Sequence, residues 1–115
     1  MLTSLYICNY ALISELKIDF DKGFSVITGE TGAGKSIILG ALSLILGQRA
    51  ETKFVKKDTE KCVIEAEFDI SNYKKLKYFF ENNDIDDTGK SCIIRRELIS
   101  SGKSRAFVND TLVSL

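Results

Sequence analysis

Histidine and proline are absent from this chain of 115 residues, and cysteine occurs only three times. The cysteines stand far apart, with no C-x-x-C pair and no histidine to complete a zinc site. We therefore expect Cys8, Cys62 and Cys92 to be reduced, buried thiols. Because no proline linker, repeat or low-complexity tract divides the chain, residues 1–115 are expected to form one domain without a second.

The chain also lacks an excess of charge of either sign, since sixteen Lys and Arg residues balance sixteen Asp and Glu residues. The composition gives no overall attraction to nucleic acid or membrane, so such a partner would need a local basic patch. The longest apolar run, 37–46, is shorter than the about 20 residues that cross a bilayer. Residues 1–10 lack the features of a secretory signal. We expect a cytoplasmic protein with no membrane partner.

Alternating and β-branched segments predict strands over much of the chain. Segments 5–10 and 15–20 are expected as strands, and a short apolar strand at 24–28 follows the turn at 21–23. Segment 62–70 alternates strictly, as a half-buried antiparallel strand does. Further strands are expected at 91–98, 105–108 and 112–115, joined by turns at 100–103 and 109–110. A hydrophobic share of 44% supplies an ordinary core for this arrangement.

Two segments have the pattern of helices. Segment 36–46 is apolar nearly all round and is followed by Gly47, a natural residue just past a helix end. We expect this helix to lie in a core, covered on several sides. Segment 72–82 has apolar residues on one face and lysines on the other, with Ser71 or Asn72 as its cap. A polar loop is expected at 83–90.

One segment carries a specific chemical signal. Residues 29–36 match G-x-x-x-x-G-K-[ST] between the expected strand 24–28 and the helix. The glycines let main-chain N–H groups approach the α- and β-phosphates, and the helix N-terminus adds the positive end of its dipole. Lys35 is expected to reach the β- and γ-phosphates, and the Ser36 hydroxyl to ligate Mg²⁺. The expected ligands are ATP and Mg²⁺, held by Gly29, Glu30, Thr31, Gly32, Ala33, Gly34, Lys35, Ser36 and Ile37.

Three other segments are similar to nucleotide-binding motifs but fail a requirement. The Gly-Lys-Ser tripeptides at 89–91 and 102–104 have Asp84 and Glu97 where the motif needs its first glycine, so both are expected to be turns. Segment 86–89 fits the D-x-x-G of small G proteins, but it follows polar residues and no N-K-x-D comes after it. A turn is the better interpretation of this segment as well.

The acidic residues needed for hydrolysis are missing. A P-loop enzyme holds Mg²⁺ through a carboxylate at the end of a buried strand and orients the attacking water with another residue. Glu65 and Glu67 lie on the expected solvent face of 62–70, and the apolar pair 93–94 leads into Arg95 rather than an acid. We therefore expect no catalytic residue in this chain.

Basic residues form two groups that are candidates for contacts with phosphates. One group crosses the expected hairpin after residue 91, and the other follows the apolar helix. A solvated face is the preferred interpretation of both groups. Their members are Arg95, Arg96, Lys103 and Arg105 in the first, and Lys53, Lys56, Lys57 and Lys61 in the second.

The motif and its flanks together resemble the RecN family of bacterial DNA-repair ATPases, which are similar to SMC proteins. The resemblance is carried by LYICNYALI at 5–13, IDF at 18–20 and GFSVITGETGAGKS at 23–36. It continues through LGQRA at 46–50, residues 64–68, Arg95-Arg96 and GKSRAFVN at 102–109, so that it covers essentially the whole chain.

This resemblance implies the N-terminal lobe of an ABC-type ATPase head. The fold class it implies is α/β, a P-loop NTPase lobe with a mixed sheet, an antiparallel meander and a buried helix after the phosphate loop. The glutamine loop, signature motif and Mg²⁺-binding acid would lie beyond a coiled coil, and Gln48 is not the glutamine of that loop. Implied partners are the C-terminal lobe, a second head that sandwiches ATP, and DNA. Lys56 stands where relatives have an arginine that approaches the nucleotide.

Two other functions remain open from the sequence. The chain could be a self-contained small P-loop kinase or GTPase, although two strands precede Gly23 and the acid is missing. It could also be a folded lobe with no measurable nucleotide affinity alone, because half of the ATP contacts would be absent.

Overall fold

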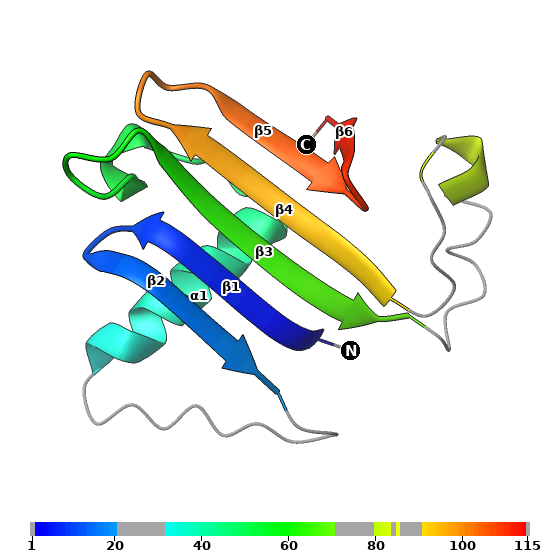
Figure 1. The fold of residues 1–115 in the computed structure, drawn as a ribbon, viewed down its shortest axis with the longest axis horizontal. Coiled ribbons are helices and arrows are strands. Elements are labelled where there is room, and N and C mark those ends of the chain that lie inside the picture. The colour runs from blue at the N-terminus through cyan, green and yellow to red at the C-terminus, as the bar shows by residue number, and fades with distance from the viewer. Residues whose placement is uncertain (1, 21–31, 71–79, 84, 86–90, 115) are drawn as a thin grey trace.

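The computed structural model describes residues 2–20, 32–70, 80–83, 85 and 91–114, with the backbone alone for 32–36. In this part of the chain one antiparallel sheet lies against one long helix (Figure 1). The helix is α1 (Gly32–Ile45), and a 3-10 turn, η1, covers Thr52–Phe54. The strands are β1 (Leu2–Tyr10), β2 (Ile13–Asp19), β3 (Lys61–Asp69), β4 (Ser91–Ile99), β5 (Ser104–Val108) and β6 (Thr111–Val113).

The six strands are ordered β2-β1-β3-β4-β5-β6, and each neighbouring pair is antiparallel. β1 and β2 form one hairpin, and β3 to β6 follow one another as a meander. The pairing sets one row of side chains across the whole sheet on the face toward α1. This row consists of Leu16, Ile7, Ile64, Arg96, Ala106 and Val113.

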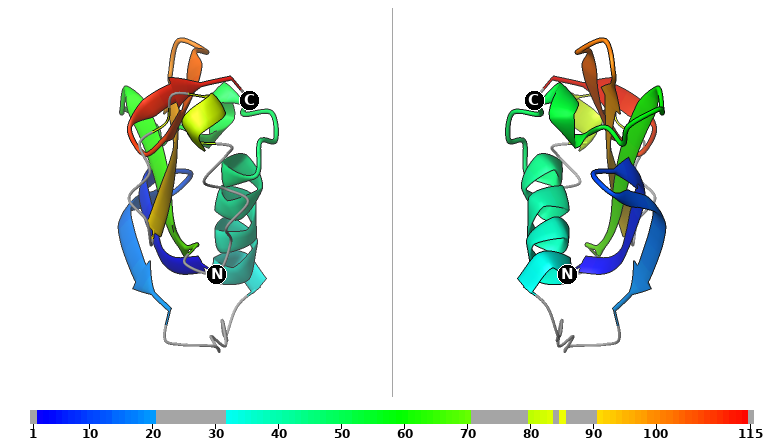
Figure 2. Two further views of the ribbon diagram at one scale, coloured as in Figure 1. Left: turned by 90° about the vertical axis from the view of Figure 1, so that its right-hand side faces the viewer. Right: turned by 90° about the vertical axis from the view of Figure 1, so that its left-hand side faces the viewer.

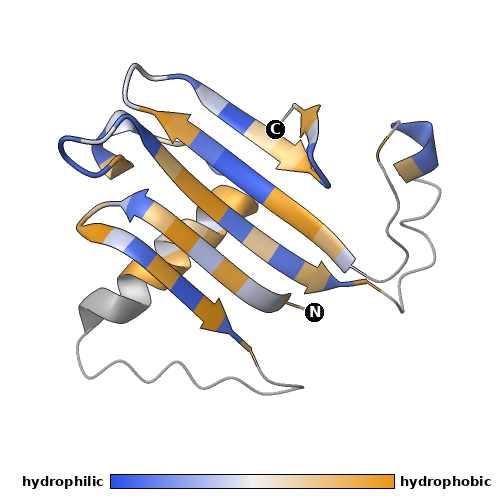
Figure 3. Cartoon of the chain, viewed as in Figure 1, coloured by the Kyte–Doolittle hydropathy of each residue, from blue (hydrophilic) through white to orange (hydrophobic). Residues whose placement is uncertain are grey.

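α1 covers one face of the sheet (Figure 2). Strand side chains alternate between the two faces, and those toward the helix are apolar and buried, such as Leu5, Ile7 and Ile64. The alternation is visible as bands of hydropathy along β1 and β3 (Figure 3). Ile38, Ala41 and further residues of α1 pack into the same core. A single hydrophobic layer between helix and sheet therefore holds the lobe together.

Most expected strands and turns are confirmed. β1, β2, β3, β4 and β5 lie where alternation predicted them, with ends shifted by a few residues. The turn at 109–110 has positive φ at both residues, 48° and 66°, as a two-residue hairpin of type I′ requires. Gly102 likewise takes a φ of 107° in the turn between β4 and β5, so the tripeptide at 102–104 is a turn as predicted.

Four expectations need correction or a limit. α1 begins at Gly32 rather than at residue 36, because the last residues of the glycine-rich segment are already helical. Its cover on several sides is not seen here, since Leu39 is 63% and Leu46 79% exposed. The described sheet is antiparallel throughout, so nothing of a mixed sheet is seen among these strands. The expected strand 24–28 lies outside the described residues.

A second, smaller hydrophobic cluster lies at the N-terminal end of β4. Phe80, Ile85 and Cys92 are buried together there, and 80–82 are helical, as expected for the end of segment 72–82. The rest of that expected helix lies outside the described residues. All three cysteines are free, and Cys62 and Cys92 are buried while Cys8 is half-buried. No helix in the described segments is long and apolar enough to cross a membrane.

Candidate nucleotide site and the helix that carries it

The glycine-rich motif runs directly into the N-terminus of α1. Because the helix starts at Gly32, residues 32–35 form its first turn, and the N–H groups of 32–34 have no partner within the helix. The first turn contains no acidic residue that would repel an anion. This arrangement fits a phosphate group, which is bound by main-chain N–H groups and the positive end of the helix dipole. Gly29, Glu30 and Thr31 lie outside the described residues, as do the side chains of Lys35 and Ser36.

The middle of α1 touches the end of β1 through a glycine. Tyr10 is 6% exposed and stacks on Phe54 with 5.7 Å between ring centroids. A Cβ at Gly40 would come within 2.5 Å of the Tyr10 hydroxyl. The missing side chain at Gly40 therefore allows the helix and the strand end to approach. Burial raises the pKa of Tyr10, which keeps its hydroxyl protonated at neutral pH.

The C-terminal end of α1 is followed by Gly47, as the sequence predicted. Gly47 has a φ of 98°, the N–H of Gln48 donates to the Ser43 carbonyl, and the N–H of Gly47 donates to the Leu44 carbonyl. These two bonds, each 3.1 Å, form a Schellman motif. Gly47 is therefore the residue just past the helix end, as expected.

Arg96 contradicts the interpretation of its group as a solvated face. Its side chain is buried, with 3% of the residue exposed, and lies on the α1 face of the sheet. Arg95 points to the opposite face, where it pairs with Glu97 at 3.3 Å and Asp110 at 3.0 Å. Since neighbours in a strand point to opposite faces, the two arginines cannot form one phosphate-binding cluster. The alternation of Cys92 and Leu98 with solvent-facing residues was the signal that places Arg96 inside.

The remaining basic residues stay on the surface, as expected. Lys103 and Arg105 are exposed, Lys53 pairs with Glu51 at 3.1 Å, and Lys61 lies 3.8 Å from Glu97. The Lys56 ammonium donates a hydrogen bond to the Ser14 hydroxyl at the start of β2. The approach of Lys56 to a nucleotide stays a prediction.

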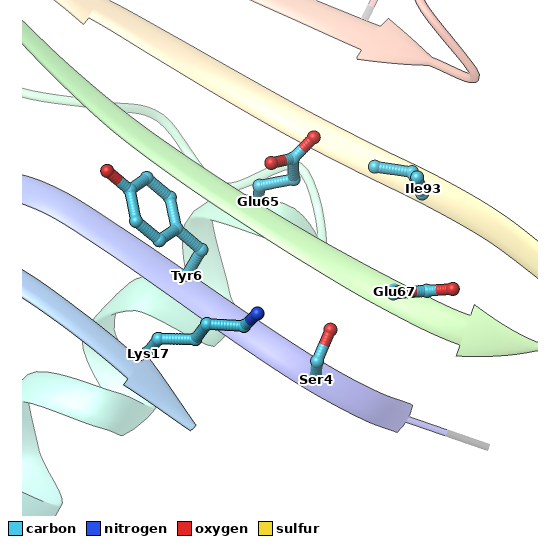
Figure 4. A pocket seen from close by; sticks show the side chains of 6 residues that line it. All are labelled: Ser4, Tyr6, Lys17, Glu65, Glu67 and Ile93. Atoms are coloured by element: carbon cyan, nitrogen blue, oxygen red, sulfur yellow. The ribbon is translucent and has the colours of Figure 1, made fainter. Parts of the chain in front are cut away.

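The outer face of the sheet has a shallow pocket of about 300 Å³ (Figure 4). Its polar wall includes Glu65 and Glu67, which alternate with the buried residues of β3 and thus face away from α1. The hydrogen bond with Cys8, more than burial, raises the pKa of Tyr6 beside them. Two carboxylates would repel a triphosphate, so this pocket does not suit a nucleotide. Its lining is Ser4, Tyr6, Lys17, Glu65, Glu67 and Ile93.

Within the described ranges, no three His, Cys, Asp or Glu side chains gather in a way that would hold a metal ion. The Mg²⁺ ligand expected at Ser36 lies where side chains are not described.

Solved structures similar to this chain include those of SMC proteins and of RecF. A structure from work on ATP-driven dimerisation and DNA-stimulated activation of SMC ATPases matches with a TM-score of 0.73 and 19% identity, covering 98% of this chain and 72% of that one. The recombination mediator protein RecF of the RecFOR pathway matches with a TM-score of 0.73 and 19% identity, covering 100% and 28%. The fold and the motif therefore define the class, an α/β lobe of a P-loop ATPase head like those of SMC proteins and RecF.

The family follows from the sequence comparison. A family model described as an AAA domain matches residues 4–114, and the chain belongs to this family. The DNA repair protein RecN of Haemophilus influenzae is 43% identical over 116 residues, and RecN of Vibrio cholerae is 42% identical over 115 residues. These matches cover 99% and 100% of the chain and 21% of each relative, so the chain spans about a fifth of their length. The resemblance to RecN is confirmed.

Proposed function

We propose that this chain is the phosphate-binding lobe of an ATPase head and that residues 29–37 bind ATP with Mg²⁺. One observation carries the proposal: the G-x-x-x-x-G-K-S motif runs into the first turn of α1, which has N–H groups without a partner within the helix and no acidic side chain. From Ile37 to Ile45 the helix packs on the sheet, which supports the helix that begins within the motif.

The residues of the loop have separate roles in this proposal. Gly29, Gly32 and Gly34 let the backbone approach the phosphates, while Glu30, Thr31, Ala33 and Ile37 contribute main-chain N–H groups. Lys35 neutralises the β- and γ-phosphates, and Ser36 ligates the metal. Mg²⁺ held by Ser36 would supply positive charge to the phosphates.

The chain supplies only part of a hydrolytic site in this proposal. The described acidic residues Glu65 and Glu67 face away from α1, so neither can reach a metal at its N-terminus. We propose that the acid, the glutamine loop and the signature motif come from the C-terminal lobe and from a second head. The chain alone then binds nucleotide without turning it over.

For the whole protein we propose a role in repair and recombination of double-strand breaks in DNA. The support is the identity of 42 to 43% with proteins named DNA repair protein RecN. The protein would act in the cytoplasm, on the nucleoid, with paired heads closing on ATP. Lys56, tethered to Ser14, is proposed to approach the nucleotide from the loop after α1.

A titration of a fluorescent ATP analogue with Mg²⁺ tests the proposal. The chain, Lys35→Ala and Lys103→Ala are compared, because Lys103 stands in the third Gly-Lys-Ser tripeptide but in an exposed turn. Loss of Lys35 should weaken binding at least about tenfold, as expected for a charged hydrogen bond to phosphate. Lys103→Ala should bind as the unchanged chain does.

Phosphate release is followed in the same samples. Saturable binding without release is the expected result. Steady turnover by the chain would instead favour a self-contained P-loop kinase or GTPase. A folded chain with no saturable binding would mean that the lobe has no measurable affinity on its own.

A further inference from the structure

Arg96 is the single charged residue in the apolar row that crosses the sheet beneath α1. Its neighbours in the row are Ile64 on β3 and Ala106 on β5. Arg96 is 3% exposed, and burial lowers the pKa of its guanidinium. A buried cation in an apolar layer is costly unless its N–H groups are well bonded. Its contacts should therefore explain its presence.

Those contacts lead to the end of the phosphate-loop helix. One terminal nitrogen of Arg96 donates to the Leu44 carbonyl at 2.8 Å and to the Gln48 carbonyl at 2.9 Å. The other terminal nitrogen donates to the Ser104 hydroxyl at 2.7 Å. Leu44 belongs to the last turn of α1, whose carbonyls lack full partners within the helix. The positive charge also lies at the negative end of the helix dipole.

All three acceptors are neutral, and Nε has no hydrogen-bond partner among the described residues. The guanidinium is therefore held by geometry at the helix end rather than by a carboxylate in these contacts. A planar, rigid fork bonded to three chain segments fixes their mutual positions. These segments are the last turn of α1, the loop that follows it and the start of β5.

A helix of this length is a rigid element, so a shift at one end also moves the other end. α1 has 14 residues, and its ends lie about 20 Å apart at 1.5 Å per residue. Within the described residues the helix is supported from the sheet side, while Leu39 on its outside and Leu46 just past its end are exposed. The contact of Gly40 with Tyr10 and the bonds of Arg96 are thus two fixed points, at the middle and at the C-terminal end.

We propose that Arg96 is a positioning residue for the phosphate loop, acting through α1 by fixing the helix end to β4 and β5. This inference rests on the proposed nucleotide binding at residues 29–37. Arg96 itself contacts no phosphate in this account. It sets where the first turn of the helix, with Lys35 and Ser36, stands relative to the sheet.

The test compares Arg96→Met and Arg96→Lys with two controls in the 115-residue chain. Arg95→Met removes the neighbouring arginine from the opposite face. Cys92→Ala lowers stability by opening a cavity in the second cluster, away from α1. Melting temperature, the Kd for Mg²⁺-ATP below the melting transition, and amide hydrogen exchange of 36–39, the second turn of α1, and of 43–48 are measured for each.

Arg96→Met should weaken Mg²⁺-ATP binding about tenfold, in the range of couplings transmitted through packed elements. Exchange should become faster at 36–39 as well as at 43–48. Arg96→Lys keeps the charge but not the planar fork. Its Kd and its exchange rates should lie between those of the unchanged chain and those of Arg96→Met. Arg95→Met and Cys92→Ala should retain the Kd of the unchanged chain, although Cys92→Ala melts earlier.

An unchanged Kd in Arg96→Met, together with a fall in melting temperature like that of Cys92→Ala, would show a purely structural role and overturn the inference. If Arg96→Met does not fold, the Kd and melting temperature of Arg96→Lys are compared with those of Cys92→Ala in the same way. If the unchanged chain binds no ATP, the proposed function of the chain fails separately. The exchange data then still decide, because unchanged protection at 36–39 in the Arg96 variants would overturn positioning.

Discussion

The hydroxyl of Tyr10 stands over Gly40 so closely that a Cβ on Gly40 would meet it at 2.5 Å. Tyr10 ends β1, and Gly40 lies in the middle of α1. Glycine inside a helix is less favourable than alanine by about 1 kcal/mol. Here it allows a buried aromatic ring to fill the space between strand and helix. The pair therefore fixes how closely the phosphate-loop helix approaches the sheet.

Replacing Gly40 by alanine should destabilise the protein despite alanine's better helix propensity. The new methyl group would force the ring of Tyr10, which is buried and stacked on Phe54, out of its position. Overpacking of this kind costs about 1 to 3 kcal/mol in the free energy of unfolding. Chemical denaturation of the variant measures the change.

The matched control removes the hydroxyl that causes the contact. In a Tyr10→Phe background the nearest remaining ring atom to the new Cβ is the ring carbon at 3.6 Å, an ordinary contact. Gly40→Ala should then be neutral or stabilising by up to about 1 kcal/mol. Equal destabilisation in both backgrounds would contradict the assigned contact.

Gly47 should also resist replacement, for a reason of backbone alone. Its φ is 98°, and a Cβ there would have no atom within 4 Å. Gly47→Ala should cost about 1 kcal/mol, the penalty of a left-handed conformation for a residue with a side chain. Gly47→Asn should cost less, because asparagine tolerates this conformation better. Equal stability of the alanine variant and the unchanged chain in urea would argue against the Schellman end.

Stability should fall in alkaline solution because of buried thiols. Burial raises the pKa of Cys62 to about 12, whereas an unfolded cysteine titrates near about 8.5. The folded state therefore keeps the proton while the unfolded state loses it, so the stabilisation is fully present below pH about 8.5 and is lost as pH rises toward about 12. The slope from this one group approaches about 1.4 kcal/mol per pH unit.

Urea denaturation at several pH values between neutral and alkaline checks this slope. Cys62→Ala should be less stable at neutral pH because of the cavity, yet should lose less stability on going to high pH. Cys8 adds a smaller contribution to the raised pKa of Cys62 than burial does, so Cys8→Ala should keep most of the slope of the unchanged chain. A slope that does not change in Cys62→Ala would show that another group titrates.

The sequence predicted the strands well because alternation of apolar and polar residues directly encodes which face is buried. Segment 62–70 became β3, and Gly47 ended α1, since each signal depends only on neighbouring residues. The start of α1 was placed four residues late. Glycine is unfavourable in a helix, so helix propensity did not predict that the glycine-rich residues 32–34 are helical. The phosphate-loop residues remain a prediction of the motif.

Other features depend on contacts between distant segments and were missed. Arg96 was assigned to a solvated face because its charge, rather than its place in the alternation, decided the interpretation. Its partners Leu44 and Gln48 are 52 and 48 residues away in the chain. The contact of Tyr10 with Gly40 is likewise invisible until the strand and the helix are placed together.

The central claim, that phosphates bind at residues 29–37 on the N-terminus of α1, is tested most directly by amide chemical shifts during titration with Mg²⁺-ATP. The account predicts saturating shifts of the N–H groups from Gly32 to Ile37, with little change at Tyr6 and Glu65 on the outer face. Saturating shifts at the outer pocket, with residues 32–37 unaffected, would contradict it.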